Sequence, residues 1–263
     1  YDPDPIQCEK NLGTLIERIY KYKINTVFLQ AFSDTGAKGY ARELYFPNRH
    51  LPMKADLMNR VAWQLSTRAG VIVYAWMPLT AFDFHDDRLL VKRIDPQTGQ
   101  TRTAPDQYKR VSIFCEEAKQ KTREIYEDLG IHVPIGGIAF HDDGVLTDYE
   151  DASPAGIAAQ VKAGFPGSIP EIQQDKPIFH QWTRWKSKAL IDFSHELIQI
   201  VKKFHPTIKT NRNIFALPVL QPASEEWFAQ NMDDFLQAYD HVALMAMPYM
   251  EKHADDADTW LVS

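Results

Sequence analysis

The stretch Ile135-Gly-Gly-Ile-Ala-Phe-His-Asp-Asp-Gly144 runs from an apolar segment directly into two adjacent carboxylates and a glycine. Ile138 and Phe140 predict a short buried strand, and Asp142 and Asp143 follow at its carboxyl end. In an α/β barrel the carboxyl ends of the strands open into the active site, so charge at this point indicates catalytic residues. The alternative is a helix N-cap or a solvated turn, because Asp-Gly is a common turn pair.

The strand at 135–140 is one of five strands that each follow a predicted helix. The spacing of Leu12, Ile16 and Ile19 predicts a helix, and residues 26–32 predict the buried strand after it. The same step recurs with strands expected at 71–76, 135–140, 208–215 and 242–247. Short strands that are apolar on both faces indicate a parallel sheet covered by helices.

A barrel is the favoured form of this parallel sheet. No G-x-G-x-x-G or G-x-x-x-x-G-K motif follows any of the strands, which disfavours a nucleotide-binding open sheet. We expect one TIM-barrel-like (β/α) domain over residues 1–263, incomplete or truncated because eight strands would need two or three further units, with one extra strand at 39–46. Long segments after the strands, the last of them expected to hold Trp182 and Trp185 in a loop, lie where barrel enzymes build their pockets.

Charge and composition narrow the class of ligand. The net charge is −6 and no predicted helix carries a basic stripe, which argues against nucleic acid and favours a cationic or neutral ligand. Aromatic residues make up 12% of the chain, and aromatic rings hold the apolar faces of sugars, although most tryptophans in proteins belong to the core.

The aspartate pair can supply acid chemistry. Side chains alternate along a strand, so Asp142 and Asp143 are expected to point different ways, and one of them is the principal acid. Glycoside hydrolysis needs a proton donor and a second group at the anomeric centre, and in substrate-assisted families the 2-acetamido oxygen of the sugar fills the second role. His141 is either a ligand contact or a packed histidine that holds the carboxylates in place. Further candidates lie at strand ends or in the long segments that follow them: Asp34, Trp76, Arg110, Asp148, Glu150, Asn211 and Asn213.

A metallohydrolase is the alternative chemistry. The tetrapeptide Phe-His-Asp-Asp occurs at 84–87 and again at 140–143, so Asp83 and His85 could join His141 and Asp142 around a zinc ion. The sequence lacks the close His-x-x-x-His spacing typical of such sites, and two loops would have to converge. We therefore expect no metal and no cofactor.

Four motifs together resemble the C-terminal glycoside hydrolase domain of PgaB-type poly-β-1,6-N-acetyl-D-glucosamine (PNAG) N-deacetylases, and the resemblance covers nearly the whole chain. They are Leu44-Tyr-Phe-Pro-Asn-Arg-His-Leu-Pro-Met53, Asn59-Arg-Val-Ala-Trp63, Val73-Tyr-Ala-Trp-Met-Pro78 and Phe140-His-Asp-Asp-Gly144. The resemblance implies a (β/α) barrel-like domain with an electronegative, polymer-binding groove. It assigns the acidic pair of that groove to Asp142 and Asp143, and sugar contacts to Tyr108 and Trp227.

The resemblance also implies a biological setting. The domain would be the C-terminal part of a periplasmic, outer-membrane-associated protein of biofilm exopolysaccharide export. Its partners would be partially deacetylated PNAG, an N-terminal deacetylase domain absent from this sequence, and an outer-membrane export porin.

Two functions are compatible with the sequence. The first is endo-hydrolysis of partially deacetylated PNAG, which requires acetylated sugar at the cleavage site. The second is a non-catalytic polysaccharide-binding module that uses the same carboxylates to hold polymer during deacetylation and export.

Overall fold

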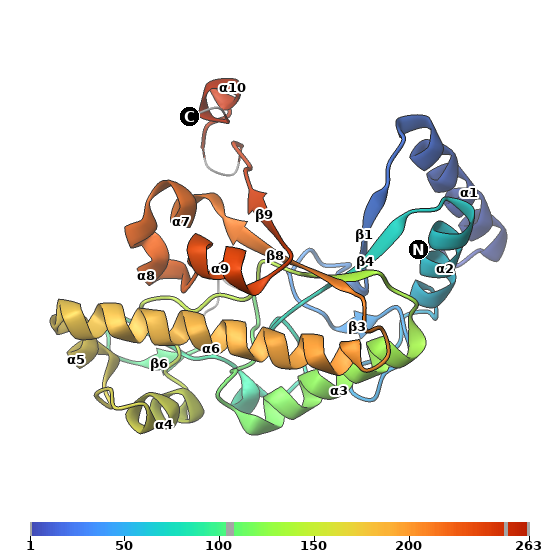
Figure 1. Cartoon of the computed structure of the whole chain (residues 1–263). Coiled ribbons are helices and arrows are strands. Elements are labelled where there is room, and N and C mark those ends of the chain that lie inside the picture. The colour runs from blue at the N-terminus through green and yellow to red at the C-terminus, as the bar shows by residue number, and fades with distance from the viewer. Residues whose placement is uncertain (1, 104–107, 250–251, 262–263) are drawn as a thin grey trace.

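The computed structural model describes residues 2–103, 108–249 and 252–261. Its described part contains a central sheet of five parallel strands in the order β1-β4-β7-β8-β9. Strand neighbours follow chain order, as in a barrel wound in one direction, and the sheet curls into an open half-barrel (Figure 1). The predicted parallel sheet and incomplete barrel are confirmed. The strands are β1 (Thr26–Gln30), β4 (Ile72–Met77), β7 (Gly137–Phe140), β8 (Lys209–Phe215) and β9 (His241–Met245).

The helices cover the outer face of the sheet. Figure 1 shows α1 (Pro5–Tyr22) and α2 (Met58–Arg68) at the β1 edge, and α3 (Glu116–His132) and α6 (Lys176–Lys202) side by side. No helix of the described part is long and apolar enough to cross a membrane. The remaining helices are α4 (Pro154–Lys162), α5 (Ile169–Gln174), α7 (Ala216–Leu220), α8 (Glu225–Phe228), α9 (Met232–Ala238) and α10 (Ala257–Trp260), with 3₁₀ turns at Asp87–Leu89 and Pro222–Ser224.

Side-chain alternation along β7 divides the core from the open face. Ile138 and Phe140 are fully buried in the main apolar core, which also contains Leu129 of α3 and Leu197 of α6. Ala139 points the other way, into the hollow of the half-barrel beside Trp76. The chain therefore leaves β7 with its next residues at the carboxyl rim of the sheet.

Two local predictions were wrong. Trp182 and Trp185 lie in α6, which begins ten residues earlier than the apolar periodicity from Lys186 indicates, and Trp182 is fully buried in a second apolar cluster with Ile169 and Ile172 of α5. The segment 39–46 adds no strand to the barrel sheet. It contributes only β3 (Glu43–Leu44), paired antiparallel with β2 (Phe32–Ser33), and a similar short pair joins β5 (Arg93–Ile94) to β6 (Thr101–Arg102).

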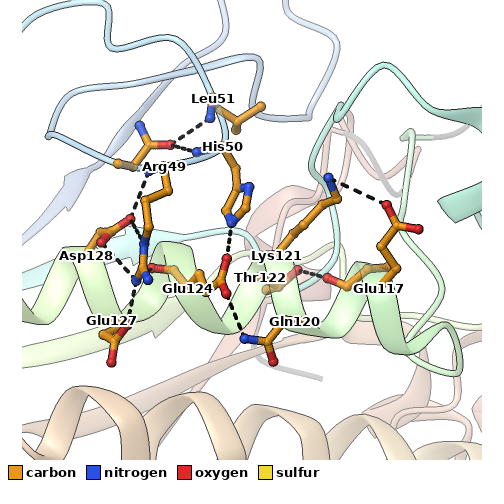
Figure 2. Close-up of polar contacts among 12 residues, drawn as sticks. Arg49, His50, Leu51, Glu117, Gln120, Lys121, Thr122, Glu124, Glu127 and Asp128 are labelled. Atoms are coloured by element: carbon orange, nitrogen blue, oxygen red, sulfur yellow. Dashed lines mark hydrogen bonds and ion pairs between the residues drawn. The ribbon is translucent and has the colours of Figure 1, made fainter.

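The loop before α2 is fastened to α3 by a polar network (Figure 2). Arg49 donates from its Nε to Asp128 Oδ2 at 3.1 Å and from its Nη2 to Glu127 Oε2 at 2.6 Å, and its backbone N–H also binds Asp128. His50 Nε2 contacts Glu124 one turn earlier on the helix. The Asn-Arg-His segment of the first resemblance motif is thus a docking element of the fold.

We expect Arg49→Met to lower the free energy of unfolding by about 1 to 2 kcal/mol, because Asp128 is buried and would lose its charged partner while the half-exposed arginine is partly screened by water. Urea unfolding measures the change. Glu127→Gln, which alters only the more exposed partner, should cost less than about 0.5 kcal/mol. Equal losses in the two variants would contradict the central role of Asp128.

Candidate active site

Asp142 lies in a cavity of about 360 Å³ at the carboxyl rim of the sheet. The side chain of Asp142 is nearly buried, and it is the one carboxylate among the described residues that line this cavity. Tyr108 comes from the loop before α3 and Trp227 from α8, and Trp227 is half exposed. The structure therefore brings together three residues that the sequence proposed, an acid and two aromatic rings. The other lining residues are Arg110, Val145, Thr147, Phe215 and Phe228.

Asp143 points away from the cavity into the loop that follows β4. Its carboxylate is fully buried and accepts the backbone N–H groups of Leu79, Thr80 and Ala81 at 3.0, 2.5 and 2.6 Å. The Thr80 hydroxyl donates to the same carboxylate at 3.0 Å. The two aspartates thus point different ways, as strand alternation predicts, and Asp143 is an anchor between two loops.

Tyr108 is held beside Asp142 by a close packing contact with Gly39. The Tyr108 hydroxyl lies 3.4 Å from Asp142 Oδ2, and burial together with this carboxylate raises the pKa of Tyr108 to about 12. A Cβ on Gly39 would lie 2.0 Å from Tyr108 Cε1, and Gly39 has φ of 74°, so only glycine fits there. Tyr108 therefore stays a neutral phenol that can donate a hydrogen bond toward the cavity.

His141 packs between aromatic rings on the open face. Its ring centroid lies 5.2 Å from that of Trp76 and 5.8 Å from that of Tyr108, and Nδ1 is 2.6 Å from Asp142 Oδ1. Burial lowers the pKa of His141, but the Asp142 contact and the charge of Asp143 outweigh burial and raise the pKa above its ordinary value of 6.5. The geometry favours the packed histidine that steadies the carboxylate.

We expect His141 to stabilise the fold more in acid than in base. Because its folded pKa is raised, its contribution is complete below the unfolded value near 6.5 and is lost as pH rises through the folded pKa. The gap in unfolding free energy between wild type and His141→Gln should therefore shrink with rising pH in urea titrations. His180→Gln, at an exposed position of α6, is the control for replacing a histidine as such. If the difference in unfolding free energy between wild type and His141→Gln grew with rising pH, the prediction of a raised His141 pKa would be wrong.

The other predicted contacts fall outside the Asp142 cavity. Asp34 accepts the N–H groups of Lys38 and Gly39 at 2.8 and 2.7 Å, so it shapes the turn under Tyr108. Trp76 and Asn213 line a neighbouring hollow of about 210 Å³ on the inner face of the sheet, together with Asn211. Asp148 lies further along the loop after β7, where burial raises its pKa and Gln173 Nε2 donates to its carbonyl.

The residues of the zinc alternative separate into two groups. Asp83 is buried and bound by Lys109 at 3.1 Å and Arg42 at 3.3 Å, with His85 Nδ1 at 3.6 Å. His141 and Asp142 pair with each other instead. Over residues 2–103, 108–249 and 252–261, no three His, Cys, Asp or Glu side chains cluster as metal ligands.

Sequence reasoning missed Phe215 and Phe228, whose rings pack 5.1 Å apart in the cavity wall. Phe215 ends β8, so its strand-end position was a usable signal, whereas Phe228 reaches the wall through a short helix that no periodicity marks. Arg110 lines the cavity and binds buried Glu150 with two contacts of 2.9 Å, which joins two of the proposed candidates in an ion pair.

The whole chain, residues 1–263, matches the family model described as "Hypothetical glycosyl hydrolase family 13". The chain belongs to this family. The poly-beta-1,6-N-acetyl-D-glucosamine N-deacetylase of Escherichia coli K12 is 50% identical over 264 residues, which cover all of this chain and 39% of that protein. The chain thus spans about two fifths of the length of the curated relatives it matches.

Solved structures agree with the family assignment. The PgaB (BpsB) glycoside hydrolase domain from Bordetella bronchiseptica superimposes with a TM-score of 0.93 at 43% identity, covering all of this chain and 75% of that one. The resemblance to the PgaB-type domain is confirmed. A β-galactosidase from Rahnella sp. R3 matches with a TM-score of 0.60 at 12% identity over 91% of this chain and 37% of its own, which shows the shared fold alone.

Proposed function

We propose that this member of the glycosyl hydrolase family cleaves partially deacetylated PNAG internally, with Asp142 as the general acid. The observation that carries the proposal is the position of Asp142, a nearly buried carboxylate in a cavity at the carboxyl rim of the sheet, between Tyr108 and half-exposed Trp227. Aromatic rings offer apolar faces to pyranose rings, and strand-end carboxylates are the usual acids of barrel enzymes.

The proposed mechanism is substrate-assisted. Asp142 gives its proton to the leaving glycosidic oxygen while the acetamide oxygen of the sugar attacks the anomeric carbon, and water then opens the cyclic intermediate. The described cavity wall holds no second carboxylate that could act as nucleophile, which supports a role for the substrate's own acetamide. The neutral Tyr108 hydroxyl donates to Asp142 Oδ2 at 3.4 Å, and we propose that it hydrogen-bonds that acetamide when the sugar is bound. The reaction as proposed uses no metal or cofactor.

Charge supports a partially deacetylated polymer. Deacetylation leaves amines that are largely protonated near neutrality, and a chain with a net charge of −6 attracts them. Salt would weaken this attraction. The name of the Escherichia coli relatives, a PNAG N-deacetylase, motivates the polymer as substrate class.

The setting follows from the same proposal. We place the chain in a longer periplasmic protein associated with the outer membrane, joined to a deacetylase domain and working beside an export porin. The polymer would then be deacetylated and cleaved by two parts of one protein.

A polysaccharide-binding module without turnover is the second candidate. The neighbouring hollow lined by Trp76, Asn211 and Asn213 favours it, because an indole and two carboxamides can hold sugar without any acid. This hollow would extend the binding surface past His141.

Release of oligosaccharides from defined polymers separates the two candidates. The purified chain is incubated with fully acetylated, partially deacetylated and fully deacetylated PNAG, and mass spectrometry measures the products. The hydrolase predicts fragments from the partially deacetylated polymer, none from the fully deacetylated one, and an acetylated sugar at each new reducing end. Binding in calorimetry without fragments would support the module instead, and cleavage of the fully deacetylated polymer would contradict acetamide participation.

A further inference from the structure

A buried arginine reaches beneath the turn that carries Asp142. Arg212 lies on β8, the strand next to β7 in the sheet, and its side chain is almost completely buried. Its Nη1 donates to the carbonyl of His141 at 3.3 Å and its Nη2 to the carbonyl of Gly144 at 2.7 Å. The guanidinium thus binds the backbone on both sides of the two aspartates.

Gly144 is shaped for this contact. A Cβ at residue 144 would lie 1.9 Å from Arg212 Nη2 and 2.7 Å from Arg212 Cζ, so any larger residue would displace the guanidinium. The glycine after the aspartates therefore serves close approach of the arginine, which is a role distinct from turn formation.

Aromatic rings and backbone carbonyls surround Arg212 in place of a carboxylate. Its neighbours are the rings of Phe140 and Phe235, with Arg212 Cζ 6.0 and 5.4 Å from their centroids. In the described part of the chain no carboxylate lies within ion-pair distance of Arg212, and Nε has no hydrogen-bond partner. Burying a charge without an anionic partner carries a desolvation cost, so a guanidinium kept in this place points to the backbone geometry that it imposes.

We propose that Arg212 is the positioning residue that fixes the Asp142–Asp143 turn, and through it the direction in which the Asp142 carboxylate enters the cavity. The inference rests on the proposed function for its catalytic consequence. Asp143 anchors the middle of the turn to the loop after β4, and Arg212 anchors both of its ends to β8. With both anchors in place Asp142 has one orientation, which is the condition for efficient proton transfer.

The experiment compares Arg212→Met with Lys186→Met, a matched control. Lys186 is also a fully buried basic residue, although burial lowers its pKa to about 7, and its Nζ binds carbonyls of the same loop, at Thr147 and Glu150, beyond the turn. For folded protein acting on partially deacetylated polymer, we expect Arg212→Met to lower kcat about 10- to 100-fold with KM little changed, because misplaced catalytic groups lose rate rather than affinity. Lys186→Met should keep kcat within about threefold.

Two further variants keep the test decisive if Arg212→Met folds poorly. Arg212→Lys keeps the charge but cannot reach both carbonyls, so it should fall between wild type and Arg212→Met. Gly144→Ala should reproduce the loss with the arginine present, and the Gly144→Ala/Arg212→Met double variant should be no worse than either single change. Equal losses of kcat in Arg212→Met and Lys186→Met, or additive effects in the double variant, would overturn the proposal.

An NMR titration of His141 separates this proposal from the proposed function. The groups that face the His141 ring are Asp142, Asp143, Tyr108 and Arg212. Burial of the ring opposes its protonation, and among these groups the charge of Arg212 does so too. Arg212→Met should therefore move the His141 titration to higher pH, and Lys186→Met should not, even if wild type releases no fragments. A wild type without fragments would reject hydrolysis alone, whereas an unmoved His141 titration in Arg212→Met would reject the arginine's contact with the turn.

Discussion

Asp142→Asn should abolish fragment release from partially deacetylated PNAG while leaving the fold intact. General acid catalysis contributes about 10²- to 10⁴-fold to rate, and an amide cannot give up the proton that the leaving oxygen needs. The side chain keeps its shape, its place in the cavity and its contact with Tyr108, so polymer binding should weaken far less than kcat. Mass spectrometry of the released oligosaccharides measures the rate, and calorimetry measures binding.

Asp192→Asn is the control for a change of net charge alone. Asp192 lies on α6, mostly exposed, and pairs with Lys188 one turn away. Its substitution removes one negative charge, as Asp142→Asn does, and should leave turnover unchanged. If Asp142→Asn kept wild-type turnover, another group would be the acid and the proposed mechanism would be wrong.

The fold could be predicted because its signals are local. The strands are short, four of the five are mostly apolar, and each follows a helix, which is typical of a parallel sheet under helices. The exception is β8, which carries Asn211, Arg212 and Asn213. The start of α6 could not be predicted this way, because residues 176–185 pack against α5 in a separate apolar cluster instead of against the sheet. A search for apolar spacing that faces the main core does not detect a helix segment that packs against a different apolar cluster.

The site was predicted in part for the same reason. Asp142 was predicted from its position at a strand end, and Tyr108 and Trp227 from the resemblance. These three residues are far apart in the sequence, so their spacing does not reveal that they line one cavity. Asp143 and Asp142 are the same residue type in adjacent positions, so only the donors around each carboxylate separate the anchor from the proposed acid. Arg212 was missed because an arginine inside a buried strand has no sequence signature for its partners, which are backbone carbonyls of another loop.

Asp143→Ala should be among the most destabilising single substitutions in the chain, by about 3 to 5 kcal/mol. Removing the carboxylate leaves the buried N–H groups of Leu79, Thr80 and Ala81 without their acceptor, and each unsatisfied buried donor costs about 1 to 3 kcal/mol. The Thr80 hydroxyl keeps the backbone carbonyl of residue 143 as an acceptor at 2.9 Å. The total cost of these unsatisfied donors is smaller if water enters the emptied space and accepts their hydrogen bonds. Urea unfolding of the variant beside wild type measures the loss.

The loss of unfolding free energy in Asp143→Ala is compared with the losses in Thr80→Val and Asp142→Asn. Thr80→Val removes one of the four donors and should cost about 1 kcal/mol, since the three backbone donors keep their acceptor. Asp142→Asn should unfold within about 1 kcal/mol of wild type, because its carboxylate makes few contacts that an amide cannot replace. The adjacent aspartates would then separate into one whose loss removes turnover and one whose loss removes the fold. A stable Asp143→Ala would mean that the loop after β4 needs no anchor, and the rigid placement of Asp142 would have to come from Arg212 alone.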